Sequence, residues 1–389
     1  MRLPKDFSFF CPLKINCGHH ALAHLPMELS AVGACAPLIL ADRDQVGKKR
    51  IKTVVDAFKT SGLTVGIFDR LTDQSGPDLL PLLSRIYADG GCDSIVAVGG
   101  GSVVDTAKCL NLMVSAGDRG QVVDPDRDDA EPGPLRPLML IATTGGNGDE
   151  ATGYASDGNQ RLCSPRLVPA VAFIDPAMMG ERDDLEVVDG AMLALVHAVE
   201  AFLDESAGPM GRAYAHTAIG LIVTCLPLAL RNTERKKNLS AVVNGQVAAS
   251  CAYSAASPGI CHTLARELKD GTDFPSGMLM AMLLPYLLAE AGNVHSEQVG
   301  NLLYPLAGAE TFAMTASELK TPRVIALLWE FYDAVNARLD LKIPSRLGDT
   351  GLADEQINRV LSQWRSGSAD DCPARIIESA RKGATPMVR

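Results

Sequence analysis

The sequence predicts two domains, a doubly wound, mostly parallel α/β domain over residues 1–180 and an all-helical domain over residues 181–389. Its 389 residues exceed the roughly 150 of an average domain. Short apolar runs alternate with helical patterns as far as residue 180, and only long helical patterns follow Asp175. With 47% hydrophobic and 21% charged residues, the chain has enough apolar material for two cores.

Five apolar runs in the first domain are expected to form strands that are buried on both faces, as a parallel sheet requires. These runs are residues 38–41, 65–68, 95–98, 138–142 and 171–174. Residues 48–61 and 79–88 place apolar side chains three and four positions apart, which indicates helices between the strands. The acidic, proline-containing stretch 124–134 is expected to be a solvated loop.

The composition argues against nucleic-acid, extracellular and membrane functions. The formal net charge is −10, and the 36 basic residues are scattered rather than clustered. Ten cysteines without a C-x-x-C pair are typical of free thiols in a reducing compartment. The N-terminus lacks a signal-peptide pattern, and the most apolar stretch, 277–289, is short for a bilayer span and carries Pro285. A cytoplasmic protein without a nucleic-acid or membrane partner is therefore expected.

A run of three glycines, Gly99, Gly100 and Gly101, stands between the strand at 95–98 and a helical pattern. Glycines let the backbone turn sharply and approach a ligand, and the N-terminus of the following helix favours an anion. Ser102 and Asp105 belong to the same segment, which matches neither the Rossmann nor the Walker pattern. A phosphate-binding turn and a glycine turn capped by Ser102 account for it about equally.

Two further polar positions follow strands. Thr143 and Thr144 open a glycine-rich loop after 138–142, which suits either a second contact with the same ligand or a simple turn. Asp42 follows 38–41, at the end of a strand where an acid often holds the ribose hydroxyls of a dinucleotide. A helix cap or a solvated turn is the commoner role of such an aspartate.

Several segments, in this order and spacing, resemble the iron-containing (group III) alcohol dehydrogenase family. They are GGGSVVDTAK at 99–108, TTGGNGDEAT at 143–152, AFIDP at 172–176, HAVEAF at 197–202 and residues 254–264, with Leu284 and Pro285 downstream. The resemblance implies an NAD(P)-dependent alcohol dehydrogenase or aldehyde reductase with a dinucleotide-binding domain followed by a helical domain. It also implies a catalytic divalent metal, iron or zinc, and a homo-oligomer of two or more chains.

The resemblance further implies the cofactor contacts. The positions concerned are Asp42, Gly99, Gly100, Gly101, Ser102, Asp105, Thr143 and Thr144. Asp42 falls where the family selects NAD over NADP, the glycine segment falls on the pyrophosphate loop, and the two threonines fall near the phosphates and the nicotinamide. The family usually has a lysine in the next hairpin, for which this sequence offers Arg161 or Arg166.

The metal site that the resemblance implies is incomplete in this sequence. Leu193 stands at the family's aspartate position and Ser276 at its last histidine, which leaves His197 and His262 as a vestigial pair. A catalytic site needs about three protein ligands, so iron or zinc is expected to bind weakly or not at all. Asp189, two turns before His197 on the same helical face, is too far along to replace Leu193 without a helix break. Glu267 or Asp273 could swing in, although nothing in the spacing favours either.

Reduction without a metal needs another group to stabilise the developing alkoxide. Arg266 takes the family position nearest the nicotinamide, with Lys269 one turn later. Arg266 could polarise the carbonyl or hold an acidic group of the substrate, and His197 or His262 could supply the proton. The maleylacetate reductases are a precedent for metal-free reduction within the family.

The expected function is that of an NAD(H)-dependent oxidoreductase that interconverts a small, anionic aldehyde or ketone and its alcohol. The alternative is a non-catalytic NAD-binding pseudoenzyme with a regulatory or structural role. A sugar-phosphate cyclase or dehydroquinate synthase of the same fold is a weaker alternative, because the sequence lacks their lysine- and histidine-rich metal site. NADH turnover with aldehydes and keto acids distinguishes the oxidoreductase from the non-catalytic pseudoenzyme.

Overall fold

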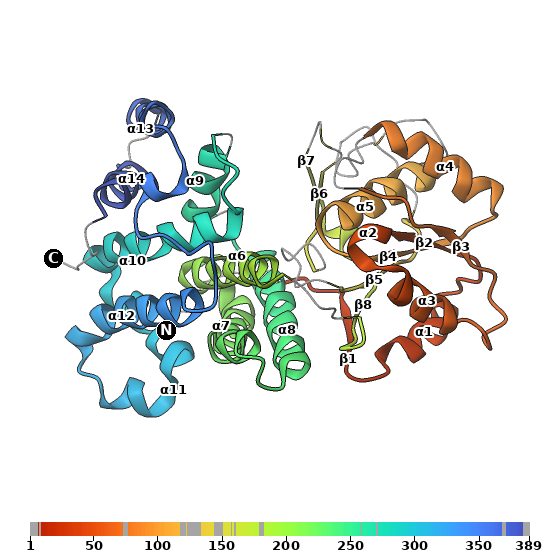
Figure 1. The fold of residues 1–389 in the computed structure, drawn as a ribbon, viewed down its shortest axis with the longest axis horizontal. Helices are drawn as coiled ribbons and strands as arrows, with labels where there is room; N and C mark the ends of the chain where they lie inside the picture. The colour runs from red at the N-terminus through yellow and green to blue at the C-terminus, as the bar shows by residue number, and fades with distance from the viewer. Residues whose placement is uncertain are drawn as a thin grey trace. The chain divides into compact units, whose positions relative to one another are not determined.

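A computed structural model of the chain describes most of its length. The described residues are 7, 9–72, 77–116, 122, 134–143, 151–156, 158, 161–178, 183–257, 259–269, 271–367 and 371–383. By packing, the chain divides into two units (Figure 1). One is Phe10–Glu181, and the other combines Met1–Phe9 with Arg182–Arg389.

Six strands of the first unit form one parallel sheet in the order β1-β8-β5-β4-β2-β3. They are β1 (Lys14–Cys17), β2 (Pro37–Ala41), β3 (Gly66–Phe68), β4 (Ser94–Val98), β5 (Leu138–Ile141) and β8 (Val171–Ile174). All five strands expected from the apolar runs are present, and the four inner strands are buried along their whole length. The predicted mostly parallel sheet is confirmed.

The two edge strands depart from the prediction. The expectation that 65–68 is buried on both faces is wrong, because β3 lies at an edge of the sheet and leaves Ile67 45% exposed. The opposite edge, β1, has no apolar run to reveal it. It pairs with β8 and carries Lys14, whose ammonium lies 2.6 Å from a carboxylate oxygen of Glu28.

Helices cover both faces of the sheet, as a doubly wound fold requires. Successive side chains of a strand point to opposite faces. Leu38 of β2 therefore packs in one core with α4 (Leu80–Asp89) and α5 (Gly101–Ser115), whereas Ile39 packs in another with α1 (Leu25–Ala31) and α3 (Lys48–Asp56). The expected helices at 48–61 and 79–88 correspond to α3 and α4.

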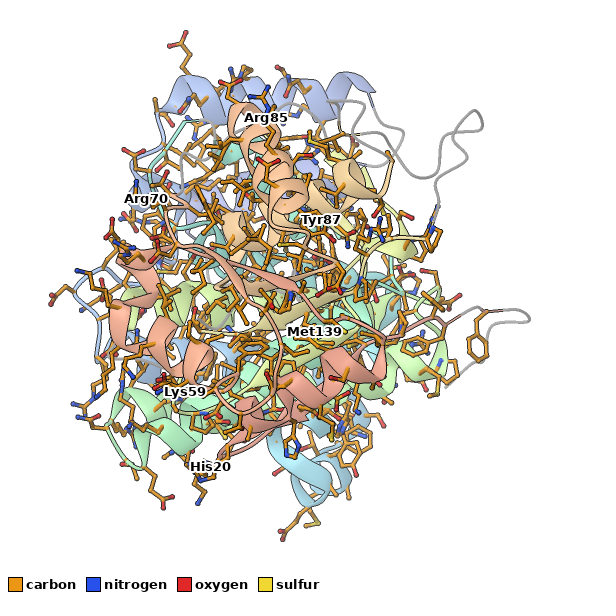
Figure 2. The ribbon with its side chains drawn as sticks, turned by 90° about the vertical axis from the view of Figure 1, so that its right-hand side faces the viewer. His20, Lys59, Arg70, Arg85, Tyr87 and Met139 are labelled. Atoms are coloured by element: carbon orange, nitrogen blue, oxygen red, sulfur yellow. The ribbon has the colours of Figure 1, made fainter. Side chains whose placement is uncertain are left out.

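Shorter elements complete this unit. They are η1 (Ala21–His24), α2 (Arg43–Val46), η2 (Pro77–Leu79), η3 (Pro165–Leu167) and an antiparallel hairpin of β6 (Tyr154–Ser156) and β7 (Arg161–Cys163). Figure 2 looks onto the unit, with buried Met139 of β5 near its centre and exposed Arg85 and His20 near its upper and lower margins.

A buried lysine holds the hairpin against α5. Lys108 is 0% exposed, and its ammonium donates hydrogen bonds to the carbonyl oxygens of Thr152 at 2.8 Å and Tyr154 at 2.7 Å. Buried charges are tolerated in proteins where polar groups surround them. The two carbonyl oxygens therefore allow Lys108 to occupy a position that solvent does not reach.

The second unit contains helices and no strand among its described residues. Its elements are α6 (Asp184–Leu203), α7 (Gly208–Leu230), α8 (Arg235–Tyr253), α9 (Ile260–Lys269), α10 (Ser276–Gly300), α11 (Leu303–Met314), α12 (Ser317–Asn336), η4 (Leu347–Thr350), α13 (Asp354–Gly367) and α14 (Cys372–Lys382). α10 packs against α6, α9, α12 and α14, so it forms the centre of a single core (Figure 1). This confirms the predicted helical domain.

Two helices of this unit, α7 and α10, are long and apolar enough to cross a membrane. The most apolar stretch, 277–289, belongs to α10, which is 25 residues long. The short length of this stretch therefore does not by itself exclude a membrane span. The apolar window of α10 is 78% buried in the unit, and that of α7 is 39% buried. Core helices of soluble proteins have the same length and composition, so the two helices are weak support for a membrane span.

Phe7 and Phe9 pack on the helical unit, whereas the expected boundaries place them in the α/β domain. Phe9 stacks on Tyr214 of α7, with ring centroids 5.6 Å apart. Phe7 lies against Gly208, which has a φ of +62° and no room for a side chain beside the ring.

We expect Lys108→Met to lower the free energy of unfolding by about 2 kcal/mol, because it leaves two inward-facing carbonyl oxygens without their charged donor. Urea unfolding measures the change. Lys52→Met is the matched control, since the Lys52 ammonium pairs with Asp56 on an exposed helix face and its loss should leave the unfolding midpoint unchanged. Equal midpoints for the two variants would show that the Lys108 hydrogen bonds do not stabilise the unit.

Candidate functional site

The glycine segment forms a turn between β4 and α5 that other residues do not readily adopt. Gly99 has a φ of +152° and Gly101 a φ of +43°, both in the region that favours glycine. Gly100 stands at the N-cap of α5, so Ser102 does not occupy the cap position. A side chain at Gly99 would also lie about 3.1 Å from Val103. The 15-residue helix α5 therefore begins at a backbone that carries no side chains. Its first N–H groups suit a phosphate group.

Parallel register brings the other predicted cofactor residues to the same edge of the sheet. Ala41 of β2 pairs with Val98 of β4, and Val98 pairs with Ile141 of β5. Asp42 follows Ala41 directly, and Gly99 follows Val98 directly. Thr143 stands two positions after Ile141, so all three lie at the carboxyl ends of adjacent strands. Open parallel sheets bind nucleotides at this edge.

Asp42 has a structural role as well. Its side chain is 5% exposed, and one carboxylate oxygen accepts a hydrogen bond of 2.9 Å from the N–H of Asp44, so it caps the short helix α2. The helix-cap alternative is therefore correct as far as this contact goes. A carboxylate accepts several hydrogen bonds, so capping α2 does not exclude a ligand contact.

The remaining predicted cofactor residues are placed only in part. Asp105 lies just beyond the first turn of α5. Thr144 and the side chain of Arg161 lie outside the described residues. Arg166 is in η3 and lines a cavity with Pro137 and Ala170, which precede β5 and β8. Arg166 is therefore at the amino edge of the sheet, and it does not join Asp42 and Gly99.

Two histidines come together in the helical unit, as the resemblance implies. Nε2 of His197 on α6 lies 3.0 Å from Nδ1 of His262 on α9, within hydrogen-bond distance. His197 also stacks on Tyr253 at the end of α8, with ring centroids 3.9 Å apart. Burial, and secondarily the neighbouring His262, lower the pKa of His197 to about 3, so this imidazole is neutral at physiological pH.

The positions around the pair do not fit a catalytic metal. Leu193 packs against the apolar core, and no cluster of three or more His, Cys, Asp or Glu side chains suited to a metal occurs among the described residues. A carboxylate oxygen of Asp189 accepts a 3.0 Å hydrogen bond from the N–H of Met278 at the N-terminus of α10, and burial raises the pKa of Asp189. Asp189 therefore caps the helix that Ser276 begins.

The other possible substitute ligands are also occupied or distant. Glu267 accepts a 2.6 Å hydrogen bond from the indole N–H of Trp364, and Asp273 is exposed in the segment before α10. Two imidazoles without a carboxylate fall short of the usual three protein ligands.

A buried carboxylate that the sequence analysis leaves without a role fixes the position of His262. Glu200 lies three residues after His197 and is 7% exposed, and its Oε1 accepts a 2.6 Å hydrogen bond from the N–H of Cys261. The N–H of His262 also donates to this carboxylate, although burial dominates and raises the pKa of Glu200 to about 7. A side chain at Gly259 would overlap the carboxylate, so this approach requires glycine. The spacing of Glu200 from His197 within HAVEAF was the available signal.

Arg266 lies one turn beyond His262 on the polar face of α9. It is exposed, and it forms no hydrogen bond or ion pair with another described residue. Lys269, a further turn on, donates a 2.7 Å hydrogen bond to the carbonyl oxygen of Phe274 and thus fixes the loop before α10. Arg266 therefore remains the cation of this face that is available to an anion.

The two buried groups give opposite pH dependences of stability. The folded pKa of His197 lies below the ordinary 6.5, so its contribution is complete above about pH 6.5 and is lost as the pH falls towards 3. The folded pKa of Glu200 lies above the ordinary 4.5, so its contribution is complete below about pH 4.5 and is lost as the pH rises towards 7. Between about pH 4.5 and about pH 6.5, the contribution of His197 to stability therefore rises with pH, whereas that of Glu200 falls.

We expect Glu200→Gln to remove one of the two dependences. From about pH 5 to about pH 6.5, the free energy of unfolding of the Glu200→Gln variant should increase more than that of the unmodified protein. The two increases should differ by about 1 to 2 kcal/mol. Urea unfolding at both pH values measures the difference. His197→Asn is the matched variant and should shift the dependence in the opposite direction. Parallel pH dependences for all three proteins would contradict the assignment.

Comparisons with known proteins identify the family. The family description "Iron-containing alcohol dehydrogenase" matches residues 12–176, and "Fe-containing alcohol dehydrogenase family, C-terminal" matches residues 187–371. The NAD-dependent methanol dehydrogenase of Bacillus methanolicus is 26% identical over 356 residues, covering 90% of this chain and 91% of that protein. The lactaldehyde reductase of Escherichia coli (strain K12) is 26% identical over 347 residues, covering 87% of this chain and 88% of that protein.

The fold agrees with these matches. A crystal structure of 1,3-propanediol oxidoreductase superposes with a TM-score of 0.84 at 22% identity, covering 97% of this chain and 100% of that one. Together with the two matched family regions, the parallel sheet with its glycine turn and the helical unit with its histidine pair show that this chain belongs to the iron-containing alcohol dehydrogenase family of oxidoreductases.

Proposed function

We propose that this chain is an NAD(H)-dependent oxidoreductase that interconverts a small, anionic aldehyde or ketone and its alcohol without a tightly bound catalytic metal. The observation that carries the proposal is the histidine pair, His197 and His262, with nitrogens 3.0 Å apart and Arg266 one turn along α9. We further propose a cytoplasmic homo-oligomer of two or more chains with no nucleic-acid or membrane partner.

NAD(H) is assigned in this proposal to the carboxyl edge of the sheet. The backbone of Gly99–Gly101 and the N-terminus of α5 suit the pyrophosphate, with Ser102 and Asp105 in the same segment. Thr143 and Thr144 follow the adjacent strand β5. The carboxylate of Asp42 accepts hydrogen bonds from a ribose diol and repels a 2′-phosphate, which favours NADH over NADPH. The nicotinamide, when bound, supplies or accepts the hydride.

The histidine pair is assigned the proton. Because Nδ1 of His262 pairs with His197, we propose that Nε2 of His262 exchanges the proton with the substrate oxygen. His197 is kept neutral by burial, so it holds the tautomer and the orientation of the His262 ring. Glu200 holds the first turn of α9 and thereby the backbone of His262.

Arg266 is assigned the acidic group of the substrate. A guanidinium stays charged at all physiological pH values and holds a carboxylate or sulfonate with two parallel hydrogen bonds. Its exposure and its lack of a partner among the described residues support this role. Its place one turn from His262 puts the cation and the proton donor on one helix face.

We expect NADH oxidation with small keto acids or aldehyde acids, and we expect Arg266→Ala to raise KM for these substrates about tenfold or more, with little change for neutral aldehydes. Losing one charge-assisted contact costs about 1.5 to 3 kcal/mol. Steady-state kinetics with a charged and a neutral panel measures this. Arg231→Ala, exposed at the C-terminus of α7, is the control.

Equal losses for charged and neutral substrates would make Arg266 a carbonyl polariser rather than a substrate anchor. NADH binding without turnover of any panel member would favour the non-catalytic alternative.

We expect protein purified without added metal to contain far less than one iron or zinc per chain, and its activity to survive chelation, because two neutral imidazoles hold a divalent ion weakly. Elemental analysis and assays with EDTA measure both. Leu193→Asp combined with Ser276→His should raise zinc affinity by orders of magnitude, whereas Leu193→Asp alone should mainly destabilise the fold. Stoichiometric, tightly bound metal in the unmodified protein would contradict the proposal.

A further inference from the structure

A cavity of about 840 Å³ lies in the helical unit, away from the histidine pair. Its walls come from the end of α6, from α7, from the C-terminal part of α10 and from α11. Neither His197 nor His262 nor Arg266 belongs to the described residues that line it. Its volume falls in the range of about 300 to 1,000 Å³ that is usual for small-molecule sites.

The cavity contains a buried cation that forms no ion pair with any described residue. Arg212 of α7 is 9% exposed, and its Nε has no hydrogen-bond partner in the described part of the chain. Its one described hydrogen bond is a long one of 3.5 Å, from Nη2 to the carbonyl oxygen of Asp204. A guanidinium remains charged when buried, so such a position is costly unless an anion approaches it.

The nearby carboxylate of Asp204 does not balance this charge. It accepts hydrogen bonds from the N–H of Ser206 at 2.8 Å, from the hydroxyl of Ser206 at 2.7 Å and from the N–H of Ser257 at 2.6 Å. These contacts hold the turn between α6 and α7, and Asp204 forms no ion pair with Arg212.

A second polar group stands beside Arg212. His216 lies one turn later on α7, lines the same cavity and has a buried Nε2 with no partner among the described residues. Burial lowers the pKa of His216 and thereby favours the neutral imidazole. The ring of Tyr304 lies 4.8 Å from it, centroid to centroid, and limits its movement. A neutral imidazole can donate one hydrogen bond to an acceptor that Arg212 also binds.

The rest of the lining favours a singly charged ligand with an apolar body. Phe202, Pro209 and Phe312 provide apolar wall, whereas Glu205 and Glu297 are exposed lining residues. Two negative charges in the same lining disfavour a doubly charged phosphate. A carboxylate carries one charge and matches the planar donor groups of a guanidinium.

We propose that this cavity binds a small monocarboxylate with an apolar or aromatic body, whose carboxylate is held by Arg212 and His216. The site is separate from the proposed catalytic site and does not depend on the proposed function.

The test is calorimetric titration of the full-length protein with phenylacetate. We expect measurable binding of phenylacetate, at least tenfold weaker binding of the uncharged isostere phenylacetamide, and weaker binding of inorganic phosphate. Arg212→Met should weaken phenylacetate binding at least tenfold. Arg231→Ala is the matched control and should leave it unchanged, because it removes an exposed cation at the C-terminus of the same helix instead.

The proposal is overturned if phenylacetate, benzoate and hexanoate all fail to bind, or if Arg212→Met leaves the affinity unchanged. It is also overturned if Arg266→Ala abolishes binding, which would place the carboxylate at the other site. Should Arg212→Met fail to fold, His216→Phe keeps the ring volume without the N–H and should weaken binding several-fold, and an unchanged affinity in this variant would overturn the proposal as well.

An acidic residue of the chain itself is the rival partner for Arg212. Phe7 packs on Gly208, next to the cavity residue Pro209, and Asp6 precedes Phe7 in the sequence outside the described residues. If Asp6 pairs with Arg212, Asp6→Asn should lower the thermal midpoint as much as Arg212→Met, and the proposal is overturned. If the cavity binds an external carboxylate, Asp6→Asn should leave both the midpoint and phenylacetate binding unchanged.

Discussion

The carboxylate of Glu200 joins α6 to the first turn of α9, and the geometry of the histidine pair depends on that contact. α6 carries His197 three residues before Glu200, and α9 carries His262 one residue after the N–H group of Cys261 that Glu200 binds. A change in this contact would alter the 3.0 Å approach of the two imidazoles. Because Gly259 alone leaves room for the carboxylate, the loop before α9 is adapted to the same contact.

The α/β unit follows from sequence patterns wherever burial is complete. The strands β2, β4, β5 and β8 are continuous apolar runs because helices cover both of their faces. The edge strand β1 reads KINC, and its side chains are mostly exposed, so its pairing with β8 leaves no trace in the pattern. Its existence depends on backbone hydrogen bonds that any sequence can make.

The candidate site was predictable to the extent that its residues follow strands or family spacing. Asp42 and Gly99 meet because parallel register aligns the ends of β2 and β4, and the order of strands in a sheet is not written in local sequence. The spacing of Glu200 from His197 places both on one face of α6. The N–H partners of Glu200 and Asp189 at the starts of α9 and α10 could not be predicted, since each lies more than sixty residues away along the chain. Arg212 carries no local signal at all, because an arginine on a helix is ordinarily solvated.

The buried charged groups of this chain differ in how many polar partners they have. This difference distinguishes groups with a structural role from groups with a binding role. The ammonium of Lys108 is surrounded by carbonyl oxygens, and the carboxyl group of Asp189 is held at a helix N-terminus. Both groups therefore complete contacts within their own unit, and their burial is explained by the fold. Arg212 has a comparable degree of burial but a single long hydrogen bond among the described residues. A buried guanidinium without an ion pair among the described residues is costly for folding, so its place beside a large cavity is better explained by a ligand than by packing.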